Sequence, residues 1–412
     1  MQSSRLRIAA RLAEILAVAA WHLARALPVV LFARVVSGPA AARRGLWRCV
    51  VGAIQDLGPA FVKFGQIAGT RVDLLPPEAL CEFRVLHDAV RPPSKRAARG
   101  MLQSRQGIRV IDPVPLGSGS IACVHRGELE DGTPVALKVK RPGIDRRMWL
   151  DLRLIRVLAR VSARLPSVRG MPMADLVDYV TEAIAGQLDF AREAENIHEL
   201  RAHLAGLPEV RVPEVHRERS SEDCLVLEYL PGLDARTPDS LPPETRAELG
   251  AAVLAAAHRM MFVAGFVHCD LHPGNVYLTT GRVVILDAGY CVRLPDRVRD
   301  LIGEFFARLA AGEGRRCGEI ILESAAGCLT DVDEKGFVES VAESVGRRAG
   351  PGNTFDMAAF GEEIFGLQRQ FGLYATADFV FPLMALLVLA GTVRGFTGDV
   401  DFQSVGLRRG SP

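Results

Sequence analysis

Hydrophobic and polar positions follow different periods in different parts of this chain. Residues 135–139, Val-Ala-Leu-Lys-Val, come after a Glu-Asp-Gly turn and alternate as a half-buried strand does, while residues 224–227 and 283–286 are short apolar runs typical of buried strands. Leucine, valine and isoleucine recur at helical spacing over residues 141–165, 174–204 and 243–264. Beyond residue 289 we expect helices only. The pattern predicts a helix-rich α+β fold.

The N-terminal 36 residues are apolar with scattered arginines. The uncharged runs 15–24 and 26–33 are each shorter than the roughly 20 residues that a membrane-spanning helix needs, and Arg25 between them would be costly in hydrocarbon. No small-residue cleavage site follows a single apolar run, so we expect no signal peptide. Two interpretations stay open: an amphipathic helix that lies on an anionic membrane surface through Trp21 and Phe32, or a helix packed into the core.

A second apolar stretch, residues 379–393, contains Pro382 and is about 15 residues long. That length is marginal for crossing a bilayer, so we expect a buried helix.

Composition excludes several classes of protein. The 412 residues carry a net charge of only +2, so we expect no nucleic-acid partner. The eight cysteines form no C-x-x-C pair and no regular spacing, which argues against zinc sites and a disulfide framework and favours a reducing compartment such as the cytoplasm.

The chemistry concentrates in residues 268–287. Asp270 stands five residues before Asn275, and Asp287 follows twelve residues later at the end of an apolar strand. Phosphoryl transfer from Mg·ATP requires this arrangement, with Asp270 as the base that orients an acceptor and with Asn275 and Asp287 as Mg²⁺ ligands. The alternative is an ordinary turn, since His-Pro-Gly-Asn is also common loop chemistry. His268 and His272 are expected to be structural hydrogen-bonding residues.

Residues that precede this loop in the chain have the pattern of a nucleotide-binding site. Gly117-Ser118-Gly119 lets backbone amides approach phosphates, and Lys138 in a Val-Ala-x-Lys strand is placed to bind the α- and β-phosphates. The strands expected around Gly117 and Lys138 add two apolar positions to the expected nucleotide contacts, Val124 and Ala136.

Glu193 is the expected ion-pair partner of Lys138, because a buried glutamate would orient the lysine and keep it charged. The alternative is a set of surface pairs along one helix, among Arg192, Glu193, Glu195 and Glu199.

Residues 224–232, a short strand followed by a turn, have the pattern of a hinge. There the backbone around Glu228 to Leu230 would pair with adenine, and Leu227 would stand at the gatekeeper position. The segment after Gly289 is too short for a long peptide-docking loop, which favours a small or lipid-like acceptor, or ATP hydrolysis alone.

Residues 58–80, GPAFVKFGQIAGTRVDLLPPEAL, resemble the N-terminal signature of the UbiB (AarF) family of atypical kinases, and the resemblance extends over about residues 50–400. It implies that Lys63 and Gln66 of the Lys-x-Gly-Gln motif reach the nucleotide cleft. Two departures stand out. Glycines replace the usual alanines of the phosphate loop, and Gln187 replaces the first acid of the family's Glu-x-Asp motif. We therefore expect Asp189 alone to hold Lys63, as a weaker latch.

The resemblance implies a protein kinase-like two-lobed fold with an N-terminal helical extension. The expected parts are an apolar segment at 1–45, a helical extension at 46–108, an N-lobe at 109–230 and a C-lobe at 231–412. The implied activity is ATP-dependent, with Mg²⁺, and supports isoprenoid-quinone or lipid metabolism at the inner face of a membrane.

Two alternatives stay open. One is a small-molecule phosphotransferase similar to aminoglycoside or choline kinases, and the other is a non-catalytic lipid-binding chaperone switched by ATP. The acceptor and the oligomeric state are not determined by the sequence.

Overall fold

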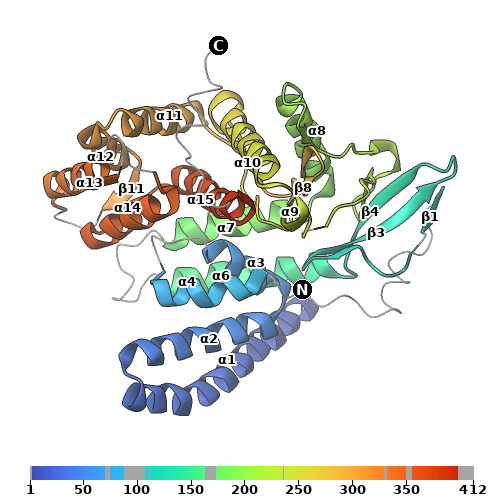
Figure 1. Cartoon of the computed structure of the whole chain (residues 1–412). Helices are drawn as coiled ribbons and strands as arrows, with labels where there is room; N and C mark the ends of the chain where they lie inside the picture. The colour runs from blue at the N-terminus through green and yellow to red at the C-terminus, as the bar shows by residue number, and fades with distance from the viewer. Residues whose placement is uncertain are drawn as a thin grey trace.

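The structure, a computed structural model, describes residues 2–69, 75–87, 107–110, 112–162, 173–234, 236–328, 332–348 and 355–397. A small lobe built on an antiparallel sheet stands beside a helical lobe, and the N-terminal helices run along one side of both (Figure 1). The sheet has the order β1-β3-β4-β6, with β2 paired to β3. Its strands are β1 (Ile108–Val110), β2 (Gly117–Ser118), β3 (Ala122–Leu129), β4 (Pro134–Lys140) and β6 (Cys224–Glu228).

The two faces of this sheet have different roles because side chains alternate along a strand. One face packs into a small core of its own, with these members: Cys123, Val135, Leu137, Val139, Cys224 and Val226. Lys138 lies on the opposite face together with Ala136, and Val124 stands directly across from Lys138 in the β3–β4 register. The expected nucleotide contacts of the sheet therefore share one face.

Three helices follow β4: α6 (Ile144–Ser162), α7 (Met173–Gly186) and α8 (Phe190–Leu204). The single helix expected over residues 174–204 is broken between α7 and α8. Asp189 causes the break, because its carboxylate accepts hydrogen bonds from the amides of Ala191 and Arg192 and so caps the first turn of α8.

The N-terminal extension consists of α1 (Gln2–Val36), α2 (Pro39–Leu57), α3 (Pro59–Ala68), α4 (Pro77–Phe83) and a short 3-10 turn, η1 (Arg84–His87). Gly38 and Gly58 separate the first three helices with φ of 85° and 101°, a backbone region that favours glycine. A proline follows each glycine at the first helical position. Helices α1 and α2 pack as an antiparallel hairpin (Figure 1), and α2 crosses the boundary expected at residue 45.

Helix α1 corrects the expectation for the N-terminus. The two apolar runs belong to one continuous helix that includes Arg25 and Pro28, and this helix is long and apolar enough to cross a membrane. The interpretation as a core-packed helix is also wrong for most of its surface, since Phe32 is 70% exposed and Leu23 63% exposed. Two other described helical stretches, 243–264 and 377–397, have comparable length and hydropathy but are mostly buried in the protein.

The C-lobe combines short strands with a helical bundle. The elements that follow β4 and α8, in chain order, include β5 (Val210–Arg211), η3 (Arg217–Arg219), α9 (Thr237–Ser240), α10 (Pro243–His258) and a π-helical turn, η4 (Arg259–Ala264). The next strands are β7 (Phe266–His268), β8 (Val276–Thr279), β9 (Arg282–Ile285) and β10 (Cys291–Arg293). The bundle is made of α11 (Asp296–Ala310), α12 (Gly314–Glu323), α13 (Glu334–Arg348), α14 (Met357–Phe371) and α15 (Ala377–Thr397).

Beyond residue 289 the expectation of helices only is wrong in detail. Besides β10, the strands β11 (Ala325–Cys328) and β12 (Leu373–Ala375) pair with each other. The expectation of a buried helix at 379–393 is confirmed, because α15 buries most of its apolar side chains in the main core.

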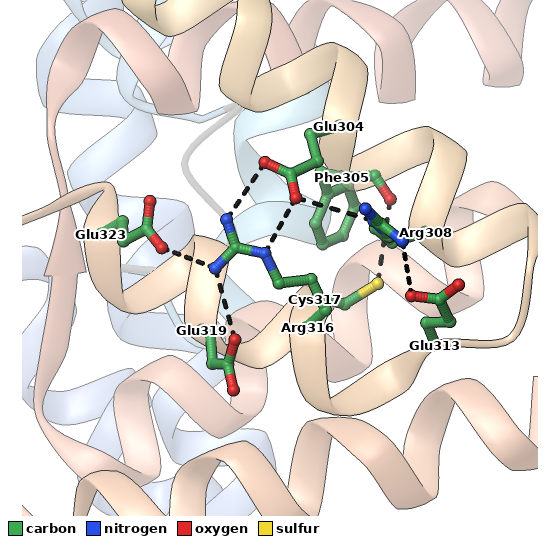
Figure 2. A network of polar contacts seen from close by, with 8 residues as sticks. All are labelled: Glu304, Phe305, Arg308, Glu313, Arg316, Cys317, Glu319 and Glu323. Carbon is green, nitrogen blue, oxygen red and sulfur yellow. Dashed lines mark hydrogen bonds and ion pairs between the residues drawn. The ribbon is translucent and has the colours of Figure 1, made fainter.

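An ion-pair network joins α11 to α12 on the outside of the bundle (Figure 2). The guanidinium of Arg316 makes two hydrogen bonds to the carboxylate of Glu304, at 2.8 and 3.1 Å, and also contacts Glu319 and Glu323. The two contacts with Glu304 cross from α12 to α11 and help to fix the relative position of the two helices, while Glu319 and Glu323 belong to α12 itself.

Candidate functional site

Lys138 is the centre of the site between the lobes. Its Nζ lies 2.6 Å from Oε1 of Glu193 and 3.0 Å from Oδ2 of Asp287, so β4, α8 and the segment after β9 meet at one cation. The ion pair expected between Lys138 and Glu193 is present. The side chain of Glu193 is fully buried, and the alternative of a solvated surface pair is therefore wrong for this residue.

Burial and charge set the protonation states of these three groups. Burial by itself would lower the pKa of Lys138, but the carboxylates of Asp287 and Glu193 outweigh it and raise that pKa. Burial raises the pKa of Glu193, against the effect of Lys138. Burial would likewise raise the pKa of Asp287, yet Lys138 and Lys63 hold it well below its usual range. At neutral pH Lys138 is thus a cation and Asp287 an anion, with 43% of the Asp287 side chain exposed.

The backbone at Asp287 adopts an uncommon conformation. Its φ is 53°, the one positive φ outside glycine in the part of the chain that the structure describes. The amide of Gly289 donates to Oδ1 of Asp287 at 3.1 Å, and the buried Asn196 of α8 donates to the carbonyl of Ala288 at 2.9 Å. These bonds hold the carboxylate toward Lys138 in a strained turn.

The loop between β7 and β8 carries Asp270 and Asn275. The Asn275 side-chain amide donates to the carbonyl of Asp270 at 2.8 Å, which leaves its Oδ1 as a ligand atom. The amide of Leu286 donates to the Asn275 carbonyl at 2.8 Å and so brings this loop next to Asp287.

The two histidines of this loop shape its backbone. Nδ1 of His268 accepts a hydrogen bond from the amide of Asp270 at 3.1 Å, and Nδ1 of His272 accepts one from the amide of Gly274 at 3.0 Å. Both histidines therefore make hydrogen bonds of the expected structural kind, and Nε2 of His272 also lies 3.8 Å from Oδ1 of Asp270.

The donor set suits Mg²⁺ that arrives with a nucleotide. Mg²⁺ prefers one or two protein oxygen ligands together with phosphate oxygens and water, and Asn275 and Asp287 offer such a pair. Within the described residues there is no group of three or more His, Cys, Asp or Glu side chains that could hold a metal. The residues therefore fit a magnesium nucleotide better than a metal bound by the protein alone.

The glycine-rich segment is held by a residue that sequence reasoning missed. Gly117 and Ser118 form β2, and the amide of Gly119 donates to the carbonyl of Ala122 at 2.8 Å. Arg141 reaches this segment from the end of β4. Its Nε donates to the Gly119 carbonyl at 3.0 Å, and its Nη2 donates to the Ser118 hydroxyl at 2.9 Å. In the sequence, Arg141 has only the pattern of a charged residue after a strand.

The hinge segment departs partly from expectation. Leu227, the expected gatekeeper, is buried opposite Ala136 in the β4–β6 register. The amide of Glu228 already donates to the carbonyl of Glu214 at 2.8 Å, and its carboxylate forms an ion pair with Arg211. The Glu228 amide and side chain are therefore taken by the protein, and an adenine contact stays a prediction for the Glu228 carbonyl and Leu230.

Helix α3 brings the Lys-x-Gly-Gln motif to the cleft. Lys63 and Gln66 line a cavity of about 430 Å³, part of it open to solvent, together with Gln187, Asp270 and residues of α15. The charge of Lys63 acts on Asp287, as the lowered pKa shows. Gln66 has a second role, since its side-chain amide donates to the Leu86 carbonyl at 2.8 Å and holds η1 against α3.

The structure does not place Asp189 where it was expected, in contact with Lys63. Asp189 is exposed and its carboxylate caps α8, and among the described residues no ion pair joins it to Lys63. Gln187 is buried and lines the cavity with Lys63. The position that lost its charge is thus the one that faces the lysine.

Two further positioning residues were missed. Asn196 lies three residues after Glu193 on the same side of α8, a spacing that sequence reasoning could have used. Thr392 of α15 donates its hydroxyl to the carbonyl of Leu271 at 2.9 Å and ties α15 to the Asp270 loop. No sequence signal singles out Thr392, because its partner is 121 residues away.

Comparison with known proteins agrees with this geometry. The family described as the ABC1 atypical kinase-like domain matches residues 87–321. A protein of Aeromonas salmonicida named probable protein kinase UbiB is 31% identical over 374 residues, which cover 85% of this chain and 67% of that protein. An uncharacterized protein of Synechocystis sp. is 32% identical over 287 residues, 65% of this chain and 70% of its own.

A solved structure shares the fold. Rv3197 of Mycobacterium tuberculosis, in a complex with erythromycin, superposes with a TM-score of 0.54 at 20% identity, over 83% of this chain and 90% of that one. The match supports the kinase-like architecture alone. Taken with the sequence relatives and the meeting of Lys138, Glu193 and Asp287, it shows that the chain belongs to the UbiB (ABC1) family of atypical kinases.

Proposed function

We propose that the chain binds Mg·ATP between its lobes and uses it for phosphoryl transfer or hydrolysis. The observation that carries the proposal is the contact of Lys138 with both Glu193 and Asp287, at 2.6 and 3.0 Å. In kinases this lysine binds the α- and β-phosphates, and the paired glutamate keeps it in place. A permanently charged lysine beside a permanently charged aspartate is the electrostatic condition for that role.

Each residue of the proposed site has a defined task. Asn275 and Asp287 would hold Mg²⁺, which neutralises charge on the phosphates when bound. The amide of Gly119 already donates to Ala122, so other backbone amides of the segment that Arg141 holds would face the phosphates. Asp270 would orient the attacking group and accept its proton.

The N-terminal extension limits the kind of acceptor that could reach the site. Lys63 and Gln66 line the cavity beside Asp270. If Asp270 orients the acceptor, the acceptor would approach the γ-phosphate through this cavity. An extended peptide would compete with α3 for this space. This arrangement supports a small or lipid-like acceptor, or water.

A membrane surface is the proposed place of action. Helix α1 exposes apolar side chains along its length, including Trp21, Leu23, Phe32 and Val35. Arg11 near its beginning is bound to Asp151 of α6 at 2.7 Å, so α1 would have to break a buried ion pair to cross the bilayer. We therefore propose a peripheral association at the cytoplasmic face, in support of isoprenoid-quinone or other lipid metabolism.

The test is Mg²⁺-dependent ATP turnover of Asp287→Asn. Asparagine is chosen because it tolerates positive φ, so the turn can persist while the charge is lost. We expect turnover to fall by roughly 10²-fold or more, the effect of removing one preorganised electrostatic group from an active site. Nucleotide binding without Mg²⁺ is measured by fluorescence titration as a check that the cleft is intact.

Glu193→Gln and Glu195→Gln form a matched pair on the same helix. Glu193 contacts Lys138, whereas Glu195 is exposed. We expect a large loss of turnover only in Glu193→Gln.

Equal turnover in the wild type and Asp287→Asn would contradict the proposed metal site. Full biological function of an Asp270→Asn variant that still binds ATP would favour the chaperone alternative.

A further inference from the structure

The glycine-rich segment is one arm of a tight hairpin, residues 117–124, in which β2 pairs with the beginning of β3. The amide of Gly119 donates to the carbonyl of Ala122 at 2.8 Å and closes the turn. Ser120 and Ile121 therefore form the tip of this glycine-rich hairpin.

The tip of the hairpin is buried, although the glycines before it are exposed. Gly117 and Gly119 lie at the surface, whereas Ser120 is 6% exposed and Ile121 is 7% exposed. To lift away from its position, the hairpin would have to bring the Ile121 side chain into water, which is unfavourable for an apolar group of this size. The hairpin is therefore anchored at its tip.

Ile121 packs into a core that is separate from the core of the sheet. It belongs to a buried cluster built mainly from α3, α6 and α7, to which α6 contributes more members than any other element. The members from α6 are Ile144, Met148, Leu152, Ile155 and Ala159. Since Met148 and Leu152 are 0% and 1% exposed, this side of α6 is a firm support for the tip.

Arg141 makes a second, polar connection between the hairpin and α6. Its guanidinium donates to the Ser118 hydroxyl and the Gly119 carbonyl, and its backbone amide donates to the carbonyl of Ile121 at 2.8 Å. The Arg141 carbonyl accepts a hydrogen bond from the amide of Ile144, the first residue of α6, at 3.2 Å. One residue thus joins three positions of the hairpin to the first turn of the helix.

An anchored hairpin suits a site that binds phosphates through backbone amides. Those amides can converge on a phosphate only when the loop is ordered, and ordering a flexible loop costs conformational entropy. Where the loop is ordered before the ligand arrives, this cost no longer weakens binding. The two anchors therefore favour nucleotide binding without touching the nucleotide.

We infer that Ile121 and Arg141 are positioning residues that fix the glycine-rich hairpin to α6 before a nucleotide binds. Their effect on ATP binding rests on the proposed function, whereas the state of the hairpin in the nucleotide-free chain does not. The hairpin would contact the phosphates in the ground state and in the transition state alike. Loss of an anchor should therefore raise the KM for ATP and leave kcat nearly unchanged.

Hydrogen exchange in the nucleotide-free chain measures the anchor directly. The reporters are the amides of Gly119 and Arg141, which are both hydrogen-bonded to the hairpin. We expect both amides to be protected in the wild type and to exchange about tenfold faster in Arg141→Gln, which loses the guanidinium but keeps the backbone. Arg146→Gln, an exposed position in the first turn of α6, is the control and should leave the rates unchanged. Unprotected reporters in the wild type, or equal rates in Arg141→Gln, would overturn the inference.

Ile121→Ala and Ile155→Ala form a matched pair. Both isoleucines belong to the same cluster and are 7% exposed, but Ile155 lies in the middle of α6. Both variants should lose stability to a similar extent, while only Ile121→Ala should release the hairpin. If the released hairpin takes its binding conformation about one tenth of the time, the KM for ATP rises about tenfold, with kcat within about twofold of the wild type.

Ile121→Val, which keeps most of the side chain, should restore a KM close to that of the wild type. An equal rise of KM in Ile155→Ala, or a fall of kcat in place of a rise of KM in Ile121→Ala, would contradict the positioning role. A wild-type chain that neither binds nor hydrolyses ATP would refute the proposed function, and the exchange rates in Arg141→Gln would still decide whether the hairpin is anchored.

Discussion

Single residues decide how the nucleotide would be restrained at this site. The family's acidic latch position is Gln187 here, and Gln187 lines the cavity with Lys63 while Asp189 caps α8. Without a competing carboxylate at position 187, the charge of Lys63 acts on Asp287. In the proposed complex with Mg·ATP, Lys63 would then act on the phosphates as well.

Gln187→Glu should pull Lys63 away from Asp287. A carboxylate in this buried cavity would attract the lysine, and we expect the KM for ATP to rise severalfold, an effect of roughly 1 kcal/mol. Asp189→Asn is the matched control, since asparagine also caps helices and only the charge is lost. Steady-state kinetics that are unchanged in Gln187→Glu, or changed equally in Asp189→Asn, would count against a latch at position 187.

At the level of elements, a buried ion pair connects α1 to α6. Nε and Nη2 of Arg11 contact the two carboxylate oxygens of Asp151 at 2.7 and 2.9 Å, and Nη2 also donates to the Leu57 carbonyl. Asp151 is completely buried and Arg11 nearly so. Because α6 also packs on α3, this contact links the exposed N-terminal helix to the helix that carries Lys63.

Arg11→Met should destabilise the protein by about 3–5 kcal/mol, since it leaves Asp151 buried without its partner. Asp151→Leu should cost less, because Arg11 keeps its contact with Glu14 at 2.7 Å. The double variant should recover most of that loss, because two apolar groups of similar size can pack together. Denaturant unfolding measures the free energies in the cycle. The exposed pair Arg43 and Glu78 is the comparison, where we expect under 1 kcal/mol. Losses that simply add in the double variant would contradict a coupled pair.

The whole molecule presents one long apolar helix on the outside. Figure 1 shows α1 at the edge of the N-terminal layer, away from the sheet of the small lobe and from the bundle of the C-lobe. Trp21 and Phe32 are 59% and 70% exposed on it. Exposed apolar surface of this extent marks an interaction site, and the arginines of α1 suit an anionic membrane.

Cosedimentation with anionic liposomes tests this surface. Trp21→Ser combined with Phe32→Ser should weaken binding by roughly 10-fold or more, because each large apolar side chain contributes about 1.5–3 kcal/mol when buried in lipid. Trp149→Ser on α6, also an exposed tryptophan, should leave binding unchanged. Equal binding of all three proteins would exclude α1 as the membrane-facing element.

The sequence by itself determined the identity of the chemical groups and the type of most elements. Spacing within a short loop and alternation along a strand are local properties, so Asp270, Asn275, Asp287 and Lys138 could be selected, and Glu193 could be paired with Lys138. The order of the kinase-like elements along the chain followed from the same local patterns and from a recognisable family signature.

Only the tertiary structure decided which partner each group would meet. Asp189 and Gln187 are two residues apart, and the start of α8 alone determines that one caps a helix while the other faces Lys63. The apolar 18-residue windows of α1 and α15 have the same mean hydropathy, 1.9, yet 11% of the first window and 67% of the second are buried. The physical reason is that burial depends on the surfaces that surround a helix, and those surfaces come from distant parts of the chain.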